Sequence, residues 1–339
     1  MSEIIRKNIA GLTLLQLKSE FEKNGLTNLD AKRVFPWIHV KSAKSFEVMS
    51  DVPLKVRKFL EENYSVGALP CAVLQTSRDG AQKALLQLED GNSVETVFIP
   101  EEKRSTVCVS SQIGCAMGCK FCYTGTQCFV RNLTSSEIIS QVLFWDRDVS
   151  NIVFMGMGEP LLNFENLSST LELLLDEKAH NFSRYSITVS TSGIIENAFF
   201  ELAKFGVKLA ISLHAPEDET RSRIMPINNK YNIKTLISAA KEYQKASNTD
   251  CVTFEYLLLK GVNDSDVDAA KLAKLLQSIP AKVNLITFNS WPGSPFAGSD
   301  RDHAHHFAKI LLAKGIRTTV RKSRGEDILA ACGQLKGEK

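Results

Sequence analysis

The chain has 339 residues, of which 44% are hydrophobic and 23% charged, a composition typical of a soluble globular protein. The length allows one large domain and a smaller one. No stretch approaches the ~20 consecutive apolar residues of a membrane span, and the N-terminus, MSEIIRKNIAGLTLL, lacks the continuous apolar core of a secretory signal. We therefore expect a cytoplasmic protein that does not contact a membrane, and nothing in the sequence requires more than a monomer.

The net charge of +3 at pH 7 is concentrated near the C-terminus. Residues 301–339 contain nine Lys/Arg and four Asp/Glu, so this segment carries +5 and the remaining chain −2. A basic segment suits a polyanionic partner such as RNA. A solvated charged surface explains the same excess equally well.

Residues 1–64 are predicted to form a small helical accessory domain. Three segments in it, TLLQLKSEFEKNG, DAKRVFPWIHV and VPLKVRKFLEENY, space their apolar residues three and four positions apart, which is the helical period. The period changes in residues 65–104, where VGALPCAVLQTS, AQKALLQLE and SVETVFIP are strand-like. Asp79-Gly80 and Asp90-Gly91 separate these runs and are strong hairpin signals. We expect a β-meander there, which leads into the main body of the chain.

Residues 105–339 alternate between apolar, β-branched runs and amphipathic stretches of helical length. The predicted strands are 105–110, 151–156, 185–191, 207–213, 252–259, 282–288 and 317–322. One predicted helix begins at a capping box, Thr134-x-x-Glu137, and the others are 164–176, 194–205, 232–246, 264–278 and 301–314. Such alternation indicates an α/β fold with a parallel sheet, either open or closed into a barrel.

Polar residues follow the predicted strands at the ends where parallel α/β proteins carry their chemistry. They are Gly156-Met157-Gly158-Glu159-Pro160, Ser190-Thr191-Ser192, Ser212-Leu213-His214 and Asn289. A cysteine-rich loop, CAMGCKFC at 115–122, follows the first strand of the main body. These segments would converge on one face, so we expect a single site there.

The loop at 115–122 contains three of the eight cysteines, spaced as C-x3-C-x2-C. In a cytoplasmic chain, clustered cysteines bind metal or take part in catalysis more often than they form disulfides. Zinc would need a fourth ligand, for which Cys108 or Cys128 is close in sequence. A 4Fe–4S cluster held by three cysteines leaves one iron open to chelate a substrate or cofactor. The spacing, at the mouth of a predicted barrel, favours the open cluster.

The same loop, with Phe121 before its last cysteine, resembles the signature of radical S-adenosylmethionine (SAM) enzymes. Further motifs are similar to the RlmN/Cfr group of RNA methyltransferases: VCVSSQIGCAMGCKFCYTGTQ, RNLTSSEI, FMGMGEPLLN, ITVSTSGI, SLHAPEDETRSRIMPIN, GVNDS, NLITFNSWPGSPF and GEDILAACGQL. The match runs from about Glu95 to Leu335. It implies a partial (β/α) barrel of radical-SAM type over residues 105–339, preceded by the helical accessory domain and the β-meander linker.

The resemblance implies two sets of cofactor ligands. Cys115, Cys119 and Cys122 would bind one 4Fe–4S cluster per chain, whose open iron holds the amino and carboxylate groups of SAM. Gly158 and Glu159 match the pair that contacts the amino group. The other matching SAM contacts are Ser190, Ser212, Leu213, His214 and Asn289. A zwitterionic cofactor needs an acceptor for its ammonium group and donors for its carboxylate and ribose.

Three further residues are implied in the reaction. Cys332 corresponds to the cysteine that takes a methyl group from a first SAM by nucleophilic displacement. A second SAM is cleaved reductively, its 5′-deoxyadenosyl radical removes a hydrogen atom from the S-methyl group, and the carbon radical adds to adenine. Cys108 matches the residue that frees the product by forming a disulfide with Cys332, and Glu95 matches the proton acceptor. Without the resemblance, the two cysteines would be read as buried hydrophobes and Glu95 as an exposed strand residue.

The resemblance implies an RlmN-type, dual-specificity enzyme. It would methylate carbon 2 of an adenosine in the peptidyl transferase centre of 23S rRNA and of an adenosine in the tRNA anticodon loop. A flavodoxin- or ferredoxin-like protein would donate electrons. The first alternative is a Cfr-type enzyme, which methylates carbon 8. The sequence GEP at 158–160, where Cfr-type enzymes tend to have alanine instead of proline, favours the RlmN type.

The second alternative is a zinc-stabilised RNA-binding module without catalysis. It would explain the basic tail and the clustered cysteines, but not the presence of Cys332 together with the polar strand ends. Cys128 stands where the family usually has glycine. A small buried cysteine can replace many glycines, so we expect Cys128 to be dispensable for the cluster.

Two groups of polar residues have an ordinary surface interpretation beside a functional one. The first group comprises candidate phosphate contacts that suit a charged rim equally well: Arg131, Arg321, Lys322 and Arg324. The second group resembles a metal cluster, but its polar, helix-like sequence SDRDHAHHF predicts surface positions: His303, His305 and His306.

Overall fold

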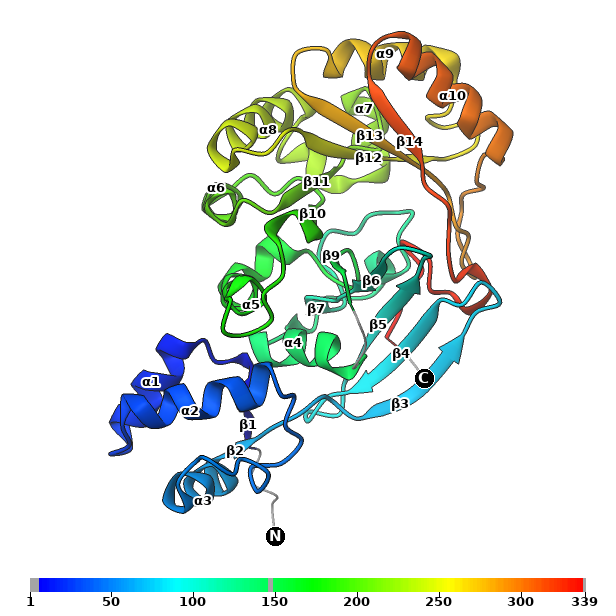
Figure 1. The fold of residues 1–339 in the computed structure, drawn as a ribbon. Coiled ribbons are helices and arrows are strands. Elements are labelled where there is room, and N and C mark those ends of the chain that lie inside the picture. Colours follow the sequence, from blue (N-terminus) through cyan, green and yellow to red (C-terminus); the bar gives the residue numbers. More distant parts are fainter. Residues whose placement is uncertain (1–5, 146–148, 338–339) are drawn as a thin grey trace.

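A curved, largely parallel sheet is the centre of the fold (Figure 1). The computed structural model describes residues 6–145 and 149–337, and in this part of the chain one sheet has ten strands. Seven of them are mutually parallel, in the order β6 (Ser105–Cys108), β9 (Asn151–Phe154), β10 (Ile187–Thr191), β11 (Lys208–Ser212), β12 (Val252–Leu258), β13 (Ala281–Thr287) and β14 (Arg317–Val320). Every strand predicted for the main body is therefore present.

The predicted β-meander continues this sheet. It consists of β3 (Cys71–Thr76), β4 (Gln82–Gln87) and β5 (Ser93–Pro100), and β5 pairs antiparallel with β6. Gly80 and Gly91 have φ of 87° and 82°, the left-handed conformation that the two hairpin turns require. Because β14 and β3 are the two ends of the strand order, the sheet is open and forms a partial barrel.

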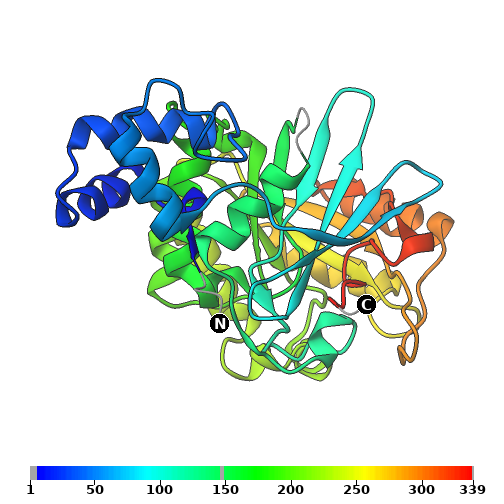
Figure 2. The ribbon, with the colours of Figure 1, turned by 90° about the horizontal axis from the view of Figure 1, so that it is seen from below.

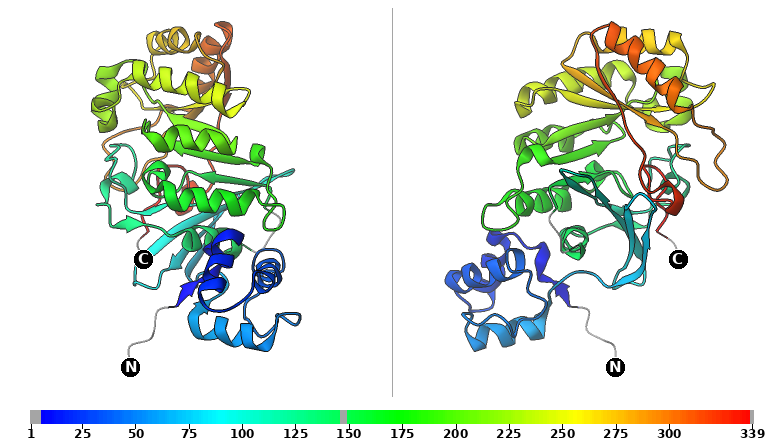
Figure 3. Two further views of the ribbon diagram at one scale, coloured as in Figure 1. Left: turned by 90° about the vertical axis from the view of Figure 1, so that its left-hand side faces the viewer. Right: turned by 45° about the vertical axis from the view of Figure 1, so that its right-hand side comes forward.

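Helices cover the outer side of the curved sheet (Figure 3). They are α4 (Ser135–Phe144), α5 (Phe164–Leu175), α6 (Asn197–Leu202), α7 (Asp218–Ile224), α8 (Ile233–Ser247), α9 (Asp266–Leu276) and α10 (Arg301–Ala313). Five of them bury apolar residues spaced three and four apart against the strands, as the sequence predicts. The capping box of α4 is present, with reciprocal hydrogen bonds between Thr134 and Glu137.

The N-terminal region forms a helical layer at one side of the core, away from the meander (Figure 2). It contains α1 (Leu14–Lys23), α2 (Asn28–His39) and α3 (Leu54–Asn63), with a short parallel pair, β1 (Lys7–Asn8) and β2 (Tyr64–Ser65). Gly11 packs directly on α4, where a Cβ atom at this position would lie 2.2 Å from Ser136 Oγ. The Ser136 hydroxyl donates to the carbonyl of Asn8 at 2.7 Å, so this region is attached to the core by close backbone contacts.

The chain returns to the centre after its last strand. From β14 the C-terminal segment runs back across the sheet to the meander (Figures 1 and 3). This path brings Cys332 to the carboxyl ends of the parallel strands. Among the described residues, no helix has the length and apolar character to cross a membrane.

Candidate functional site

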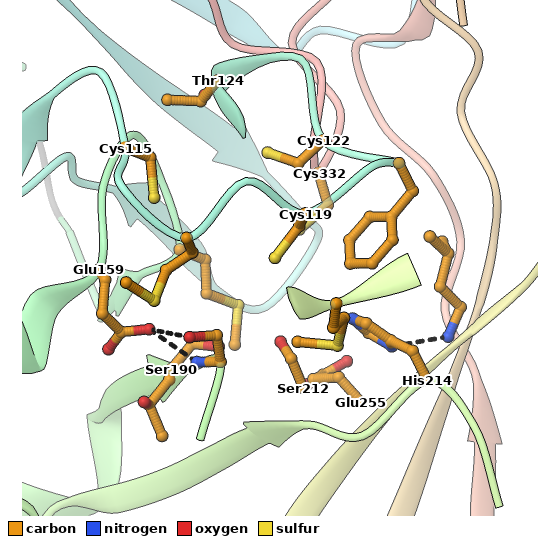
Figure 4. Close-up of a pocket in the computed structure, with 18 of the residues that line it drawn as sticks. Cys115, Cys119, Cys122, Thr124, Glu159, Ser190, Ser212, His214, Glu255 and Cys332 are labelled. Carbon is orange, nitrogen blue, oxygen red and sulfur yellow. Dashed lines mark hydrogen bonds between the residues drawn. The ribbon is translucent and has the colours of Figure 1, made fainter. Parts of the chain in front are cut away.

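A cavity opens at the carboxyl ends of the parallel strands, and three cysteines line one wall of it (Figure 4). Cys115, Cys119 and Cys122 lie on the loop after β7 (Gln112–Ile113), which pairs with β8 (Arg131–Asn132). The empty space of the cavity, its open mouth included, is about 980 Å³.

The loop that carries the cysteines is held by backbone hydrogen bonds from two other parts of the chain. The Lys120 amide donates to the carbonyl of Ile224 at 2.9 Å, and the Tyr123 amide donates to the carbonyl of Gly333 at 2.7 Å. Gly118 turns the loop between the first two cysteines with a φ of 62°. The loop is thus fixed to α7 on one side and to the C-terminal segment on the other.

Burial keeps the three thiols protonated when no metal is bound. It raises the pKa of Cys115 to about 12 and also raises the pKa of Cys119 and Cys122. Binding of iron would release these protons, because the thiolate is the ligand. Within the described residues, no three His, Cys, Asp or Glu side chains surround the position of a single metal ion. Three thiols on one cavity wall are the donor set that a 4Fe–4S cluster with an open iron requires.

The opposite wall consists of the polar strand ends. Gly158, Glu159, Ser190, Ser212 and His214, all predicted SAM contacts, line it. They lie just beyond the carboxyl ends of β9, β10 and β11 or at those ends. A zwitterionic cofactor could therefore contact both walls at once.

Glu159 is a buried carboxylate in the loop that follows β9, only 3% exposed. Its Oε2 accepts hydrogen bonds from the amide and the hydroxyl of Ser192, both at 2.7 Å. Burial raises its pKa, and the hydrogen bonds from Ser192 oppose that shift. Gly158 next to it has a φ of 95°, and a Cβ atom there would lie 2.4 Å from Gln112 Cβ, so the position requires glycine.

His214 is held as a neutral imidazole. Burial and the nearby Arg221 lower its pKa to about 3. Its Nδ1 accepts a hydrogen bond from the Leu257 amide at 3.0 Å, so the ring proton is on Nε2. The ring also packs edge-on against Phe121 of the cysteine loop, with centroids 4.8 Å apart.

Two predicted SAM contacts, Leu213 and Asn289, are not among the described residues that line the cavity. Leu213 is fully buried between two lining residues, Ser212 and His214. Asn289 is 6% exposed and directly follows Phe288, which lines the cavity. The structure thus brings both residues to the edge of the cavity but not onto its surface.

Glu255 is a cavity residue that the sequence analysis missed. It lies on β12, is 5% exposed, and accepts hydrogen bonds from Asn284 Nδ2 at 2.9 and 3.2 Å. Burial raises its pKa, and the charge of Arg321 lowers it. A lone acidic residue in the apolar strand VTFEYLL is the signal that would have revealed it.

Cys332 lies in the same cavity as the three loop cysteines (Figure 4). Its segment is anchored there, since Thr124 Oγ1 donates to the carbonyl of Leu335 and Gln334 Nε2 donates to that of Ser290, both at 2.6 Å. Burial raises the pKa of Cys332, and the charge of Arg321 opposes that shift. The half-buried thiol of Cys332 is thus placed beside the guanidinium of Arg321.

Cys108 ends β6 and is buried outside the described lining of the cavity. Burial and, to a smaller extent, the nearby Cys332 raise its pKa to about 12. The two cysteines lie far apart in the sequence, yet each is near the guanidinium of Arg321. The fold therefore brings together the pair that the family resemblance assigns to a disulfide.

Glu95 lies on β5 and is 4% exposed, not exposed as its strand position alone would suggest. Its Oε1 forms an ion pair with Lys83 at 2.8 Å. Its Oε2 accepts from the backbone amides of Lys336 and Gly337 at 2.7 and 3.0 Å. Both oxygens are therefore engaged by the meander and the C-terminal segment, and Glu95 is not among the described lining residues.

The four candidate phosphate contacts have different surroundings in the structure. Arg131 forms ion pairs with Asp90 and Glu137 at 2.6 and 2.8 Å, so its charge is used within the protein. Arg321 belongs to the group around Cys332, and Arg324 donates to the carbonyl of Pro100. Lys322 is the exposed member of the four.

The three histidines of the predicted surface group and Cys128 are not among the described residues that line the cavity. His305 and His306 are exposed on α10, and His303 is half-buried against the carbonyl of Asp264. They occupy the surface, as predicted. Cys128 is also exposed, so the expectation of a buried cysteine in place of glycine is wrong. Gly114 packs closely against the backbone of Cys128, because a Cβ atom at Gly114 would lie 2.0 Å from the Cys128 carbonyl oxygen.

Known proteins resemble the chain over almost its whole length. Residues 109–273 match the radical SAM superfamily, and residues 7–66 match the ribosomal RNA large subunit methyltransferase N-terminal domain. The dual-specificity RNA methyltransferase RlmN of Paracoccus denitrificans is 43% identical, over 99% of this chain and 91% of its own. That of Rhodospirillum rubrum is 44% identical, over 98% and 80%.

A solved structure gives the same result in three dimensions. The crystal structure of a radical SAM methyltransferase from Sphaerobacter thermophilus superposes with a TM-score of 0.92 at 40% identity. The superposition covers 98% of this chain and all of the other. The chain therefore belongs to the RlmN family of radical SAM RNA methyltransferases.

Proposed function

We propose that this protein methylates carbon 2 of adenosine in 23S rRNA and in tRNA, with Cys332 as an intermediate methyl carrier. The observation that carries the proposal is the position of Cys332 in one cavity with Cys115, Cys119 and Cys122. Cys332 must accept a methyl group, and a hydrogen atom must then be removed from that S-methyl group. Its sulfur therefore needs to lie within reach of a SAM held by the loop cysteines. The curated relatives are named as dual-specificity RNA methyltransferases, which supports two classes of RNA substrate.

The three loop cysteines would hold a 4Fe–4S cluster and the opposite wall would hold SAM. When bound, a cluster of this type with an open iron supplies the electron for reductive cleavage of SAM. Glu159, which is buried and accepts hydrogen bonds from Ser192, would in its ionised form accept the ammonium group of SAM. Gly158 lines the cavity with its backbone, and Ser190 and Ser212 offer hydroxyl groups at the strand ends. His214 would line the cavity beside these groups, and Leu213 and Asn289 would support its edge.

Cys332 would act as the nucleophile that takes the first methyl group. The positive charge of Arg321 favours its thiolate and offsets part of the effect of burial. Cys108, buried next to it, would then form a disulfide with Cys332 as the bond between the Cys332 side chain and the product breaks. Glu95 would accept the proton from the product carbon after the C-terminal segment has moved away from its carboxylate.

Several finer features belong to the same proposal. The enzyme would act in the cytoplasm as a monomer, with a flavodoxin- or ferredoxin-like protein as electron donor and thiols to reduce the disulfide. Residues 1–64 would form a separate accessory domain that contacts RNA, residues 65–104 the meander, and residues 105–339 the catalytic core.

Transfer of a labelled methyl group tests the proposal directly. The protein would be purified under anaerobic conditions, loaded with iron and incubated with methyl-labelled SAM without RNA. We expect the label on the peptide that contains Cys332, identified by mass spectrometry. Cys332→Ser should remove it, while Cys128→Ala, at an exposed position, should retain it. Label on another residue, or none in iron-loaded protein, would contradict the proposed role of Cys332.

A further inference from the structure

Arg221 is a fully buried arginine on α7, beside the site but not in contact with the cavity. Its Nε donates to the carbonyl of Leu213 at 3.0 Å, and its Nη2 donates to those of Ser192 and Ser212 at 2.8 and 3.0 Å. Its Nη1 donates to Asn228 Oδ1 at 2.9 Å. One side chain thus holds the backbone just after two neighbouring strands, β10 and β11.

The strand-end residues whose carbonyl groups Arg221 holds are themselves proposed SAM contacts or donate hydrogen bonds to one. Ser192, whose carbonyl Arg221 holds, donates from its amide and hydroxyl to the Glu159 carboxylate. Ser212, whose carbonyl it also holds, lines the cavity itself. A guanidinium has five donors in a rigid planar fork, so it can satisfy these carbonyls together, which the single ammonium group of a lysine cannot do.

The helix that carries Arg221 also holds the cysteine loop. The carbonyl of Ile224, in the last turn of α7, accepts the hydrogen bond from the Lys120 amide between Cys119 and Cys122. Ile224 and Met225 pack with Cys119 in one apolar cluster. Both walls of the cavity therefore depend on the position of α7.

Among the described residues, all hydrogen-bond acceptors of the Arg221 guanidinium are uncharged groups. They are the carbonyls of Ser192, Ser212, Leu213 and Tyr231 and the side-chain amide of Asn228. The carboxylate of Asp218 is one hydrogen bond further away, on Asn228 Nδ2. Burial lowers the pKa of Arg221 to about 10, and the nearby Cys119 and Asp218 oppose that shift. Burying a charge without a directly paired counter-charge costs free energy of folding, so buried charges usually have an oppositely charged group or a metal site nearby.

We propose that Arg221 is a positioning residue of the cofactor site, which fixes the ends of β10 and β11 and supplies the buried positive charge that balances the iron-bound cysteine thiolates. The inference rests on the proposed cluster at Cys115, Cys119 and Cys122. A cluster with three thiolate ligands carries a net negative charge, which grows by one on reduction. A fixed positive charge nearby favours both the bound and the reduced forms.

Two variants separate the charge from the hydrogen bonds. Arg221→Lys keeps the charge but loses the planar fork, whereas Arg221→Gln loses the charge as well. Tyr243→Phe is the matched control, because Tyr243 is also fully buried and its hydroxyl donates to the carbonyl of Val207, at the amino-terminal end of β11 away from the site. Each protein is loaded with iron without oxygen, and its melting temperature with and without iron is recorded.

Three quantities are then compared: iron per chain, the midpoint potential of the cluster and the dissociation constant of SAM. We expect both Arg221 variants to bind SAM about tenfold more weakly, since the strand ends lose two or more hydrogen bonds. Arg221→Gln alone should bind less iron and shift the midpoint potential to a more negative value. Arg221→Lys should keep both near those of the unchanged protein.

The outcomes distinguish the inference from the proposed function. If the unchanged protein binds no cluster, the proposed site itself is wrong. If it does, and Arg221→Gln matches the Tyr243→Phe control in iron content, potential and SAM binding, the inference is wrong. Should Arg221→Gln fail to fold, Arg221→Lys decides, because undiminished SAM affinity in that variant contradicts the positioning role.

Discussion

The carboxylate of Glu95 accepts a hydrogen bond from the backbone amide of Lys336 at 2.7 Å, so a strand of the meander holds the C-terminal segment around Lys336 in place. Lys83 pairs with the same carboxylate at 2.8 Å and also donates to the carbonyl of Leu329 at 3.2 Å. Cys332 lies between these two anchored points. The position of the proposed methyl carrier therefore depends on a buried ion pair outside the cavity.

Glu95→Gln should loosen the C-terminal segment. The substitution removes the charge that pairs with Lys83, and breaking one partner of a buried pair costs about 3 kcal/mol. We expect trypsin to cleave after Lys336 faster in this variant than in the unchanged protein, and mass spectrometry measures the rate. The control is Glu89→Gln, an exposed glutamate next to the same hairpin. Equal cleavage rates in the two variants would show that Glu95 does not hold the segment.

Glu159→Gln should weaken SAM binding without loss of iron. An amide cannot pair with the SAM ammonium as a carboxylate does, and we expect the dissociation constant to rise by about tenfold or more. Equilibrium dialysis with the iron-loaded protein measures it, with the exposed Glu165→Gln as control. Unchanged affinity would remove Glu159 from the SAM site.

The same carboxylate predicts a pH dependence of SAM binding. Burial raises the pKa of Glu159, so as the pH falls the carboxylate becomes protonated at a higher pH than an ordinary glutamate does. The ionised form is the one that accepts the ammonium group. SAM affinity should therefore decline on acidification while the cluster is still intact, and this decline should be absent in Glu159→Gln.

Cys119→Ala should abolish iron binding, and Cys128→Ala should not affect it. Cys119 is buried on the cavity wall, whereas Cys128 is exposed outside it. Iron and acid-labile sulfide per chain, measured after anaerobic loading, test the difference. Cys71→Ala, at another exposed cysteine, is the control for handling losses. Iron loss in Cys128→Ala would revive four-cysteine ligation.

Cys108 should react slowly with iodoacetamide in the folded protein. Burial is the main cause that raises its pKa to about 12, and Cys332 adds to it, so very little thiolate is present at neutral pH. Its rate should rise about tenfold per pH unit below that pKa, and at pH 8 it should be at least tenfold slower than that of the exposed Cys128. Peptide mass spectrometry follows both sites. Equal rates in the folded chain would contradict the burial of Cys108.

Local sequence patterns predicted most of the helices and strands, because the apolar spacing and the capping residues that stabilise each element lie within the element itself. The β-branched run before Gly156 and the capping box at Thr134 each specify a structure within a few residues. Helix α7 was missed for the opposite reason. Its sequence DETRSRI has no apolar stripe, and the buried hydrogen bonds of Arg221 hold it instead.

In the candidate site too, the features that depend on local sequence were predicted, and those that depend on long-range contacts were not. The loop cysteines and the polar strand ends are visible in sequence, because ligand spacing and strand position are local properties. The burial of Glu95 and the nearness of Arg321 to Cys332 depend on segments that meet only in the folded chain. Family resemblance named Glu95 and Cys332, but only the fold shows that one anchors the segment that carries the other.

Nucleoside mass spectrometry tests the proposed function most directly. The chain would be expressed in a bacterium that lacks its own enzyme of this type, and 23S rRNA and tRNA would be digested separately. The account predicts 2-methyladenosine in both pools, and none in cells that express Cys332→Ser. The appearance of 8-methyladenosine, or of no methylated adenosine in cells with soluble, iron-loaded protein, would contradict it.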